Sequence, residues 1–252
     1  MQNSTTNPFF YILVLLWIIP IQSFCQATLS MDSLLTVLNN SNDDSTKVLV
    51  MNSISDLKTK NLQYVVAIKY ANAALVVAEK SGNTKGMADS YYQIGLIYWY
   101  LNEFEKALLY HQKALDNYEY TGDENRISKT YNRLGHDYAD LKRYDKAMKC
   151  FEKALESAIQ LNDQQNISRN LDLIGFVYMN LSDYPKSLEY YVKSLKSCEE
   201  RNDQTGIAGT CNDIGELYEL QHNHSEALKF ANRGLSISTE LKDVPHTLEA
   251  YE

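Results

Sequence analysis

Three cationic side chains have the spacing of a carboxylate-binding site. Lys129 and Arg133 stand four residues apart, which places them on one face of a helix, and Arg169 follows Lys129 by 40 residues. Guanidinium groups bind carboxylates through charge-assisted, often paired hydrogen bonds. These residues can therefore hold a carboxylate or an acidic side chain. The alternative is that they are ordinary solvated charges on helix surfaces.

Catalytic and metal-binding motifs are missing from the sequence. It contains no glycine-rich phosphate loop and no HExxH, GxSxG or CxxC motif. His222 and His224 form the only close histidine pair, but no third ligand stands near them, so we predict no metal site. We expect His111 and His136 to be structural histidines. The sequence thus predicts a protein that is not an enzyme and uses no cofactor.

Composition indicates an all-helical protein. The 252 residues include 19 tyrosines but only 10 glycines and 4 prolines, and helix-forming Ala, Leu, Lys and Glu are abundant. The 32 acidic residues outnumber the 24 Lys and Arg, for a net charge of -8, and no basic block interrupts the polar stretches. The sequence therefore predicts no basic surface that could neutralise phosphate groups, and we exclude nucleic acid as a partner.

The first 31 residues carry no charged side chain. Their apolar run, residues 9–21, is about thirteen residues long, and spanning a bilayer takes roughly 20. It has the length of a signal-peptide core, so we expect residues 1–27 to be a signal peptide cleaved after Ala27. Lipidation at Cys25 and a retained anchor are the alternatives, although Phe24 stands where a lipoprotein signal needs a small residue. Each alternative places the remainder in the periplasm or cell envelope of a bacterium, with membrane contact only through a retained signal or a further segment.

The cysteines of the exported part indicate no disulfide framework. Cys150, Cys198 and Cys211 are odd in number and lack the spacing of a metal site. A bridge between Cys198 and Cys211 stays open at this point, because each lies near the end of neighbouring predicted helices. We expect the cysteines to be small buried apolar residues.

A glycine-centred motif returns every 40 residues and explains the helical composition. Its four copies are YYQIGLIY from Tyr91, YNRLGHDY from Tyr131, LDLIGFVY from Leu171 and CNDIGELY from Cys211. Small residues share a second frame, at Ala107, Ala147, Ser187 and Ala227. Apolar residues recur at intervals of three and four, which predicts two amphipathic helices in each repeat.

Glycine inside a helix costs about 1 kcal/mol relative to alanine, so each copy needs a compensating contact. We expect Gly135 to face Ala147 and Ala154 of the second helix, so that the two backbones approach closely. We expect the side chains of Leu134, Tyr138 and Leu155 to fill the space around these small residues. Between repeats, Gly or Asn suits a left-handed helix end, and the following aspartates suit N-caps of the next helix. These aspartates are Asp123, Asp163, Asp203 and Asp243.

The pattern resembles the tetratricopeptide repeat over roughly residues 44–252, with Tyr, Leu or Cys in place of the family's Trp. The resemblance implies an all-α, right-handed superhelical solenoid of antiparallel helix pairs. The expected divisions are a capping helix in 28–43, a degenerate repeat in 44–83, repeats in 84–123, 124–163, 164–203 and 204–243, and the start of a further repeat in 244–252.

The 40-residue period is longer than the standard 34 and resembles the sensor or scaffold arrays of bacterial envelope signalling proteins. We therefore expect a non-catalytic scaffold that binds a protein or peptide in a concave groove. The alternative is the N-terminal sensor region of a membrane-bound signalling protein, a histidine kinase or helix-turn-helix regulator whose output domain lies beyond this chain.

The same resemblance implies which residues line the groove. The site residues that we expect are Trp99, Lys129, Asn132, Arg133, His136, Arg169, Phe176 and Asn212. Further residues in the same frame are Tyr92, Leu96, Asp172, Met179, Glu216 and Glu219. In similar arrays an asparagine at the place of Asn132 and Asn212 hydrogen-bonds the backbone of an extended peptide, because its amide both donates and accepts.

Overall fold

The computed structural model describes the backbone of residues 31–248 and the side chains of residues 31–241. Eleven helices and no strands make up this part of the chain. They are α2 (Met31–Asn40), α3 (Asp44–Lys60), α4 (Tyr64–Ser81), α5 (Thr84–Tyr100), α6 (Phe104–Thr121), α7 (Glu124–Asp140), α8 (Tyr144–Gln160), α9 (Gln164–Asn180), α10 (Tyr184–Glu200), α11 (Gln204–Leu220) and α12 (His224–Leu248). The predicted signal peptide lies outside the described residues, as do residues 249–252.

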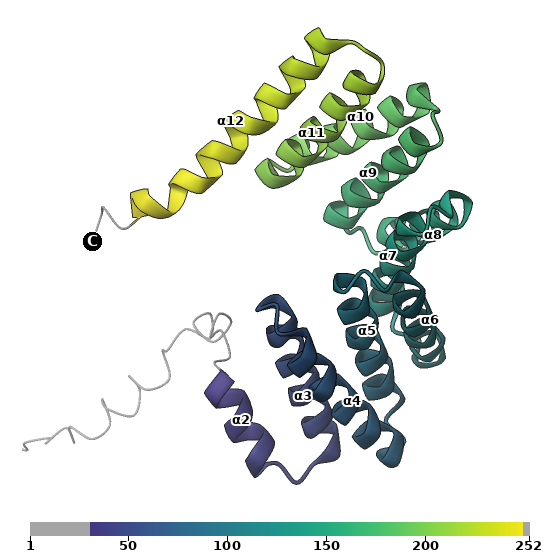
Figure 1. Ribbon diagram of the computed structural model, residues 1–252, viewed down its shortest axis with the longest axis vertical. Coiled ribbons are helices and arrows are strands. Elements are labelled where there is room, and N and C mark those ends of the chain that lie inside the picture. Colours follow the sequence, from purple (N-terminus) through teal and green to yellow (C-terminus); the bar gives the residue numbers. More distant parts are fainter. Residues whose placement is uncertain (1–30, 249–252) are drawn as a thin grey trace, which may run out of the picture.

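The helices form a solenoid of antiparallel pairs. The pairs are α3/α4, α5/α6, α7/α8, α9/α10 and α11/α12. The two helices of each pair pack against each other, and consecutive pairs pack against one another along the chain. Figure 1 shows the pairs following a curved path from α2 and α3 at one end to α11 and α12 at the other. The all-α solenoid predicted from the sequence is confirmed. No helix in residues 31–248 combines the length and the apolar character that a membrane span requires.

Aspartate side chains start α7, α9 and α11 as predicted, and Asn83, which was not predicted as a cap, starts α5. The Asp123 carboxylate accepts a hydrogen bond from the backbone N–H of Arg126 at 3.2 Å, and Asp203 accepts from Gly206 at 2.9 Å. Asp163 and Asn83 make the same contact at the starts of α9 and α5. These caps satisfy N–H groups that have no partner within the helix.

The helix boundary expected at Asp243 is absent from the described backbone, because α12 continues without a break to Leu248. Earlier repeats end in a residue with positive φ, namely Gly82, Gly122, Asn162 and Asn202. The sequence has Lys242 at the corresponding place. Lysine has little preference for the left-handed conformation that ends the other helices, and this explains why the helix runs on.

The glycine of the repeat faces a ring from the second helix. A Cβ added to Gly95 would stand 2.5 Å from the His111 ring, and one on Gly175 would stand 2.7 Å from the Tyr191 ring. Contacts this short are not tolerated, so only glycine leaves room for these rings. The ring of the second helix therefore explains why the first helix has glycine at this position.

In the third repeat this ring belongs to Phe151, which lies against Gly135. Ala147 and Ala154 are fully buried, as expected, but the space next to the glycine is filled by Phe151 and not by the three residues assigned to it. Sequence comparison missed this contact because the residue type at this place differs in each repeat. It is His111, Phe151, Tyr191 and then Ala231.

A buried pair of titratable residues joins the second and third repeats. His111 Nδ1 lies 2.6 Å from Asp137 Oδ2, and both side chains are fully buried. His111 Nε2 and Asp137 Oδ1 have no hydrogen-bond partner. Burial raises the pKa of Asp137 above its usual value, and the contact with His111 opposes that rise. His111 is thus a structural histidine, as expected from its place on a second helix.

Apolar clusters lie between consecutive helix pairs. One contains Tyr191, Leu195 and Cys198 of α10 together with Cys211 and Ile214 of α11. Because this cluster draws on two repeats, a single helix pair could not bury its apolar face alone. Cys150, Cys198 and Cys211 are buried free thiols. The expectation of small buried residues is confirmed, and the bridge left open for Cys198 and Cys211 is absent.

Candidate peptide-binding groove

The predicted groove residues come from the first helices α5, α7, α9 and α11. Each of these helices buries one face against its second helix and leaves part of the opposite face accessible. A centre is made of Arg133 and His136 on α7 and Arg169 on α9, and the charges of the two arginines contribute, after burial, to the lowered pKa of His136. The structure therefore brings together three of the predicted site residues.

Within residues 31–241, the two arginines of this centre have no anionic partner. Arg133 Nε donates a hydrogen bond to the Tyr92 hydroxyl at 3.2 Å, which links α7 to α5. Among the described residues, neither Arg133 nor Arg169 forms an ion pair with a carboxylate. Partial burial is the main cause that lowers the pKa of Arg169 below its usual value, and repulsion from Arg133 lowers it further. An anion placed between the two guanidinium groups would relieve this repulsion.

Asn132 and His136 of α7 each have a buried atom without a hydrogen-bond partner among the described residues. Asn132 is 8% exposed, and its Oδ1 is buried without a hydrogen-bond partner. His136 packs edge-on against the Phe151 ring, with 5.5 Å between the ring centres, and its Nε2 is also buried and unpaired. Burial, with smaller contributions from Arg133 and Arg169, lowers the pKa of His136 to about 4. His136 is therefore neutral near pH 7, so the positive charge of this centre comes from the arginines.

The other predicted residues lie around this centre. Lys129 is exposed on α7, and Phe176 is 37% exposed on α9. Trp99 Nε1 donates to Asp140 Oδ2 at 2.6 Å, so this side chain joins α5 to α7 at the far end of the helices. Asn212 is exposed on α11 and belongs to a different cavity, at the end of the array.

An acidic pair follows the arginines along the array. Asp172 on α9 and Asp213 on α11 influence each other electrostatically, and Asp172 Oδ1 accepts a hydrogen bond from Thr210 Oγ1 at 2.9 Å. Burial is the main cause that raises the pKa of Asp172 and of Asp213. Together with the charge of Asp172, burial raises the pKa of Asp213 to about 8. Asp213 therefore holds its proton near neutral pH. The predicted groove included Asp172 but missed Asp213.

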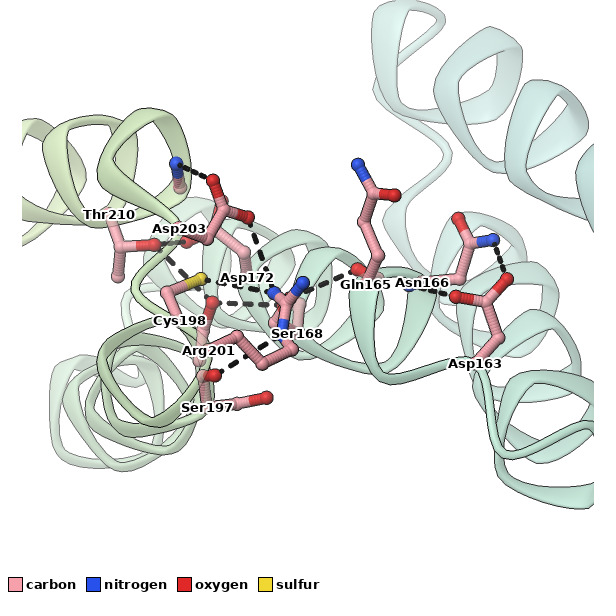
Figure 2. A network of polar contacts seen from close by, with 12 residues as sticks. Asp163, Gln165, Asn166, Ser168, Asp172, Ser197, Cys198, Arg201, Asp203 and Thr210 are labelled. Atoms are coloured by element: carbon pink, nitrogen blue, oxygen red, sulfur yellow. Dashed lines mark hydrogen bonds and ion pairs between the residues drawn. The ribbon is translucent and has the colours of Figure 1, made fainter. Parts of the chain in front are cut away.

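Arg201 organises a polar network beside this pair (Figure 2). Its Nη2 donates to Ser168 Oγ at 2.7 Å and pairs with Asp203 Oδ2 at 3.3 Å. The network borders a cavity of about 290 Å³ among α9, α10 and α11, to which Arg169 and Asp172 also contribute. Sequence reasoning missed Arg201, although it is the only cation in its frame. The same place holds Ser81, Thr121 and Leu161 in the earlier repeats.

Comparison with known families decides the identity of the repeat. A family model described as tetratricopeptide repeat matches residues 48–119 and 166–240. A second model with the same description matches residues 128–158. The chain belongs to the tetratricopeptide repeat family. No curated protein sequence matches it.

Solved structures share the fold of this tetratricopeptide repeat protein. BtubC from P. vanneervenii superposes with a TM-score of 0.71 at 16% identity, and the match covers 84% of this chain and 87% of BtubC. A Rap protein complexed with the competence and sporulation factor gives 0.70 at 19% identity, covering 93% of this chain and 64% of the Rap protein.

Aspartyl phosphate phosphatase F from Bacillus subtilis gives a TM-score of 0.68 at 20% identity, covering 94% of this chain and 63% of the phosphatase. The chain thus spans just under two thirds of the phosphatase and of the Rap protein. At these identities the similarity shows a common fold, and it carries no residue role from one protein to another.

Proposed function

We propose that this tetratricopeptide repeat protein is a non-catalytic scaffold that binds an extended peptide or protein segment along its first helices. The observation that carries the proposal is the pair Arg133 and Arg169, whose positive charges repel each other and which form no ion pair with a carboxylate among the described residues. An acidic side chain of the partner would pair with both arginines. The Asn132 amide would hydrogen-bond the backbone of the same segment after a rotation that exposes it.

A binding assay with labelled peptides tests this function. Fluorescence anisotropy would compare a peptide containing Asp and Glu with its Asn and Gln counterpart at low and moderate salt. We expect the acidic peptide to bind more tightly, with a preference that weakens as salt screens the charges. Arg133→Gln or Arg169→Gln should each weaken acidic-peptide binding by roughly tenfold, the size expected for one lost charged hydrogen bond.

Arg143→Gln is the matched control, because Arg143 lies in the turn before α8 and pairs with Glu105 at 2.6 Å, away from the arginine centre. Its affinity should equal that of the parent. Equal affinity of the parent for the acidic and neutral peptides would contradict the proposed site.

The similarity to a Rap protein complexed with the competence and sporulation factor favours a second candidate function. In this alternative the array is the sensor region of a bacterial membrane-bound histidine kinase or helix-turn-helix regulator. Sequencing the gene beyond the codon for Glu252 separates the candidates. A further apolar span followed by a kinase or regulator domain selects the sensor, and a stop codon selects the scaffold.

Export to the bacterial cell envelope is part of the proposal. Its support is the uncharged, apolar segment within residues 1–27. Cell fractionation followed by mass spectrometry of the mature N-terminus tests it. A protein that begins at Thr28 and is recovered from the envelope or periplasm is expected, and an intact Met1 terminus in the cytosol would contradict export.

A further inference from the structure

The cavity of about 290 Å³ beside the Arg201 network lies at the junction of the fourth and fifth repeats. Its lining residues come from α9 and α10 of the fourth repeat and from α11 of the fifth, and Figure 2 shows the polar network next to it. The helix that packs over the fourth pair, α11, is therefore present and forms one wall. The size of the cavity depends on the side chains at this junction.

Larger side chains occupy the corresponding place at the first two junctions of the array. At the first, Val48 packs so closely that a Cβ on Gly86 would stand 2.8 Å from its Cγ1. At the second, the Tyr118 ring is fully buried. Its hydroxyl donates to Asp89 Oδ1 at 2.5 Å, and Arg126 Nη1 lies 3.6 Å from the same oxygen. A phenol, a carboxylate and a guanidinium thus come together at the second junction.

The third junction has the small Ala158 at the place of Tyr118, but its first helix α9 carries two larger residues. These are Asn166 and Arg169, and α11 has Gly206 and Gly209 at the same places of the 40-residue period.

The fourth junction has small residues at all of these places. By the 40-residue period, Ser168 corresponds to Val48, and Cys198 corresponds to Tyr118. Gly209 of α11 adds no side chain, and a Cβ there would meet no atom within 4 Å. Each smaller residue removes volume that is filled at another junction, and this explains why a cavity lies here.

The cavity is lined by a carboxyl and a guanidinium group, the two groups that surround the Tyr118 hydroxyl at the second junction. They belong to Asp172 and Arg169. Arg169 forms no ion pair with a carboxylate within residues 31–241. Asp172 Oδ1 accepts from Thr210, and a carboxyl group has lone pairs for further donors.

The hydroxyl groups in the walls already donate to other protein atoms. Ser168 Oγ donates to the Gln165 carbonyl at 3.0 Å. Ser194 Oγ donates to the Ser168 carbonyl at 2.9 Å, and Thr210 Oγ1 donates to Asp172. Arg169 therefore supplies the donors that a ligand in this cavity would meet, and Asp172 supplies an acceptor. A group that both donates and accepts a hydrogen bond satisfies the two together.

We propose that this cavity binds the phenol ring of a tyrosine in the partner segment. The ring would fill the space next to Gly209 and Cys198, and its hydroxyl would donate to Asp172 and accept from Arg169. The inference rests on the proposed function, because Arg169 also belongs to the acidic anchor, and a guanidinium has five N–H donors for both contacts. The partner segment thus has an Asp or Glu for the two arginines and a tyrosine close to it.

Uncharged amino-acid amides test the cavity separately from the acidic anchor. The probes are N-acetyl-tyrosinamide, N-acetyl-phenylalaninamide and N-acetyl-alaninamide, titrated into the full chain while NMR follows the amide signals of Gly209 and Thr210. We expect the tyrosine probe to shift both signals. The phenylalanine probe should bind roughly fivefold more weakly for one lost hydrogen bond, and the alanine probe at least roughly tenfold more weakly for the missing ring.

Three variants make the test specific. Gly209→Leu places a side chain in the cavity at a position where a Cβ meets no atom, so it should fold and lose binding of the tyrosine probe. Glu152→Leu, at an exposed position of α8, is its control and should bind like the parent. Asp172→Asn keeps an acceptor and should keep the preference for tyrosine over phenylalanine, whereas Asp172→Leu should lose it.

Several results would overturn the inference. They are equal binding of the tyrosine and alanine probes, unchanged tyrosine binding by Gly209→Leu when circular dichroism shows it folded, and no preference of the parent for tyrosine over phenylalanine. The acidic peptide without an aromatic residue should still bind Gly209→Leu. If the parent binds that peptide but not the tyrosine probe, the cavity assignment fails and the proposed function stands. If the parent binds the tyrosine probe without preferring acidic peptides, the acidic anchor fails instead.

Discussion

The ring of Phe151 lies on the backbone of Gly135, and no side chain larger than hydrogen fits between them. Gly135→Ala should therefore destabilise the protein by about 1–3 kcal/mol, because the added methyl group must displace a fully buried ring. Urea-induced unfolding followed by circular dichroism measures this as a lower midpoint. A midpoint equal to that of the parent would show that Phe151 can move away at little cost.

Gly209 is a control for Gly135, because no ring lies against it. It also lies inside a first helix, but a Cβ there would meet no atom within 4 Å. Gly209→Ala should stabilise the protein by about 0.5–1 kcal/mol, since alanine has the higher helix propensity and nothing opposes its methyl group. The same urea experiment checks it, and a lower midpoint would contradict the open space next to Gly209.

His111 and Asp137 form a buried pair whose counterparts one repeat later are apolar. The residues 40 positions on are Phe151 and Val177, which share one fully buried cluster. His111→Phe alone leaves the Asp137 carboxyl buried without a partner and should cost about 3–5 kcal/mol, as should Asp137→Val. The double variant recreates the Phe151–Val177 contact and should recover most of this loss. Unfolding midpoints of all four proteins give the coupling, and simple additivity would show that the pair is not coupled.

His136 should make stability depend on pH. Its folded pKa of about 4 lies below the usual value of 6.5, so the unfolded chain binds a proton that the folded chain refuses. Stability should thus be full above pH 6.5 and fall as the pH drops toward 4, by about 1–3 kcal/mol. His136→Gln should flatten this part of the profile, whereas His222→Asn, in an exposed turn, should not. Parallel profiles for the parent and His136→Gln would show that other groups cause the dependence.

Leu62 has a strained backbone in the turn between α3 and α4. Its φ is 58°, and its side chain is 72% exposed. Leu62→Gly should stabilise the protein by about 0.5–1 kcal/mol, because glycine adopts positive φ without a steric penalty. Asn102 has the same φ in the next repeat, and Asn102→Gly should gain less since asparagine already tolerates this conformation. Thermal unfolding compares the two variants, and an equal effect would rule out backbone strain as the cause.

The sequence by itself determined the repeating architecture. A constant interval between glycines, apolar spacing of three and four, and capping residues at Asp123, Asp163 and Asp203 are local signals, because each acts through its own helix or turn. Those signals predicted the helix pairs and most of their ends. They failed at Asp243, where the residue before it lacks the left-handed preference that the pattern assumed.

The tertiary structure decided which side chains meet across helices. The contact of Phe151 with Gly135, the effect of Asp172 on Asp213 and the buried pair His111 and Asp137 each depend on residue types that differ from one repeat to the next. A repeating pattern describes what the copies share, whereas packing and proton sharing depend on the volume and charge of each single neighbour. The repeat period of the sequence therefore determines the array. The groove and its cavities depend on the residues that differ from one repeat to the next.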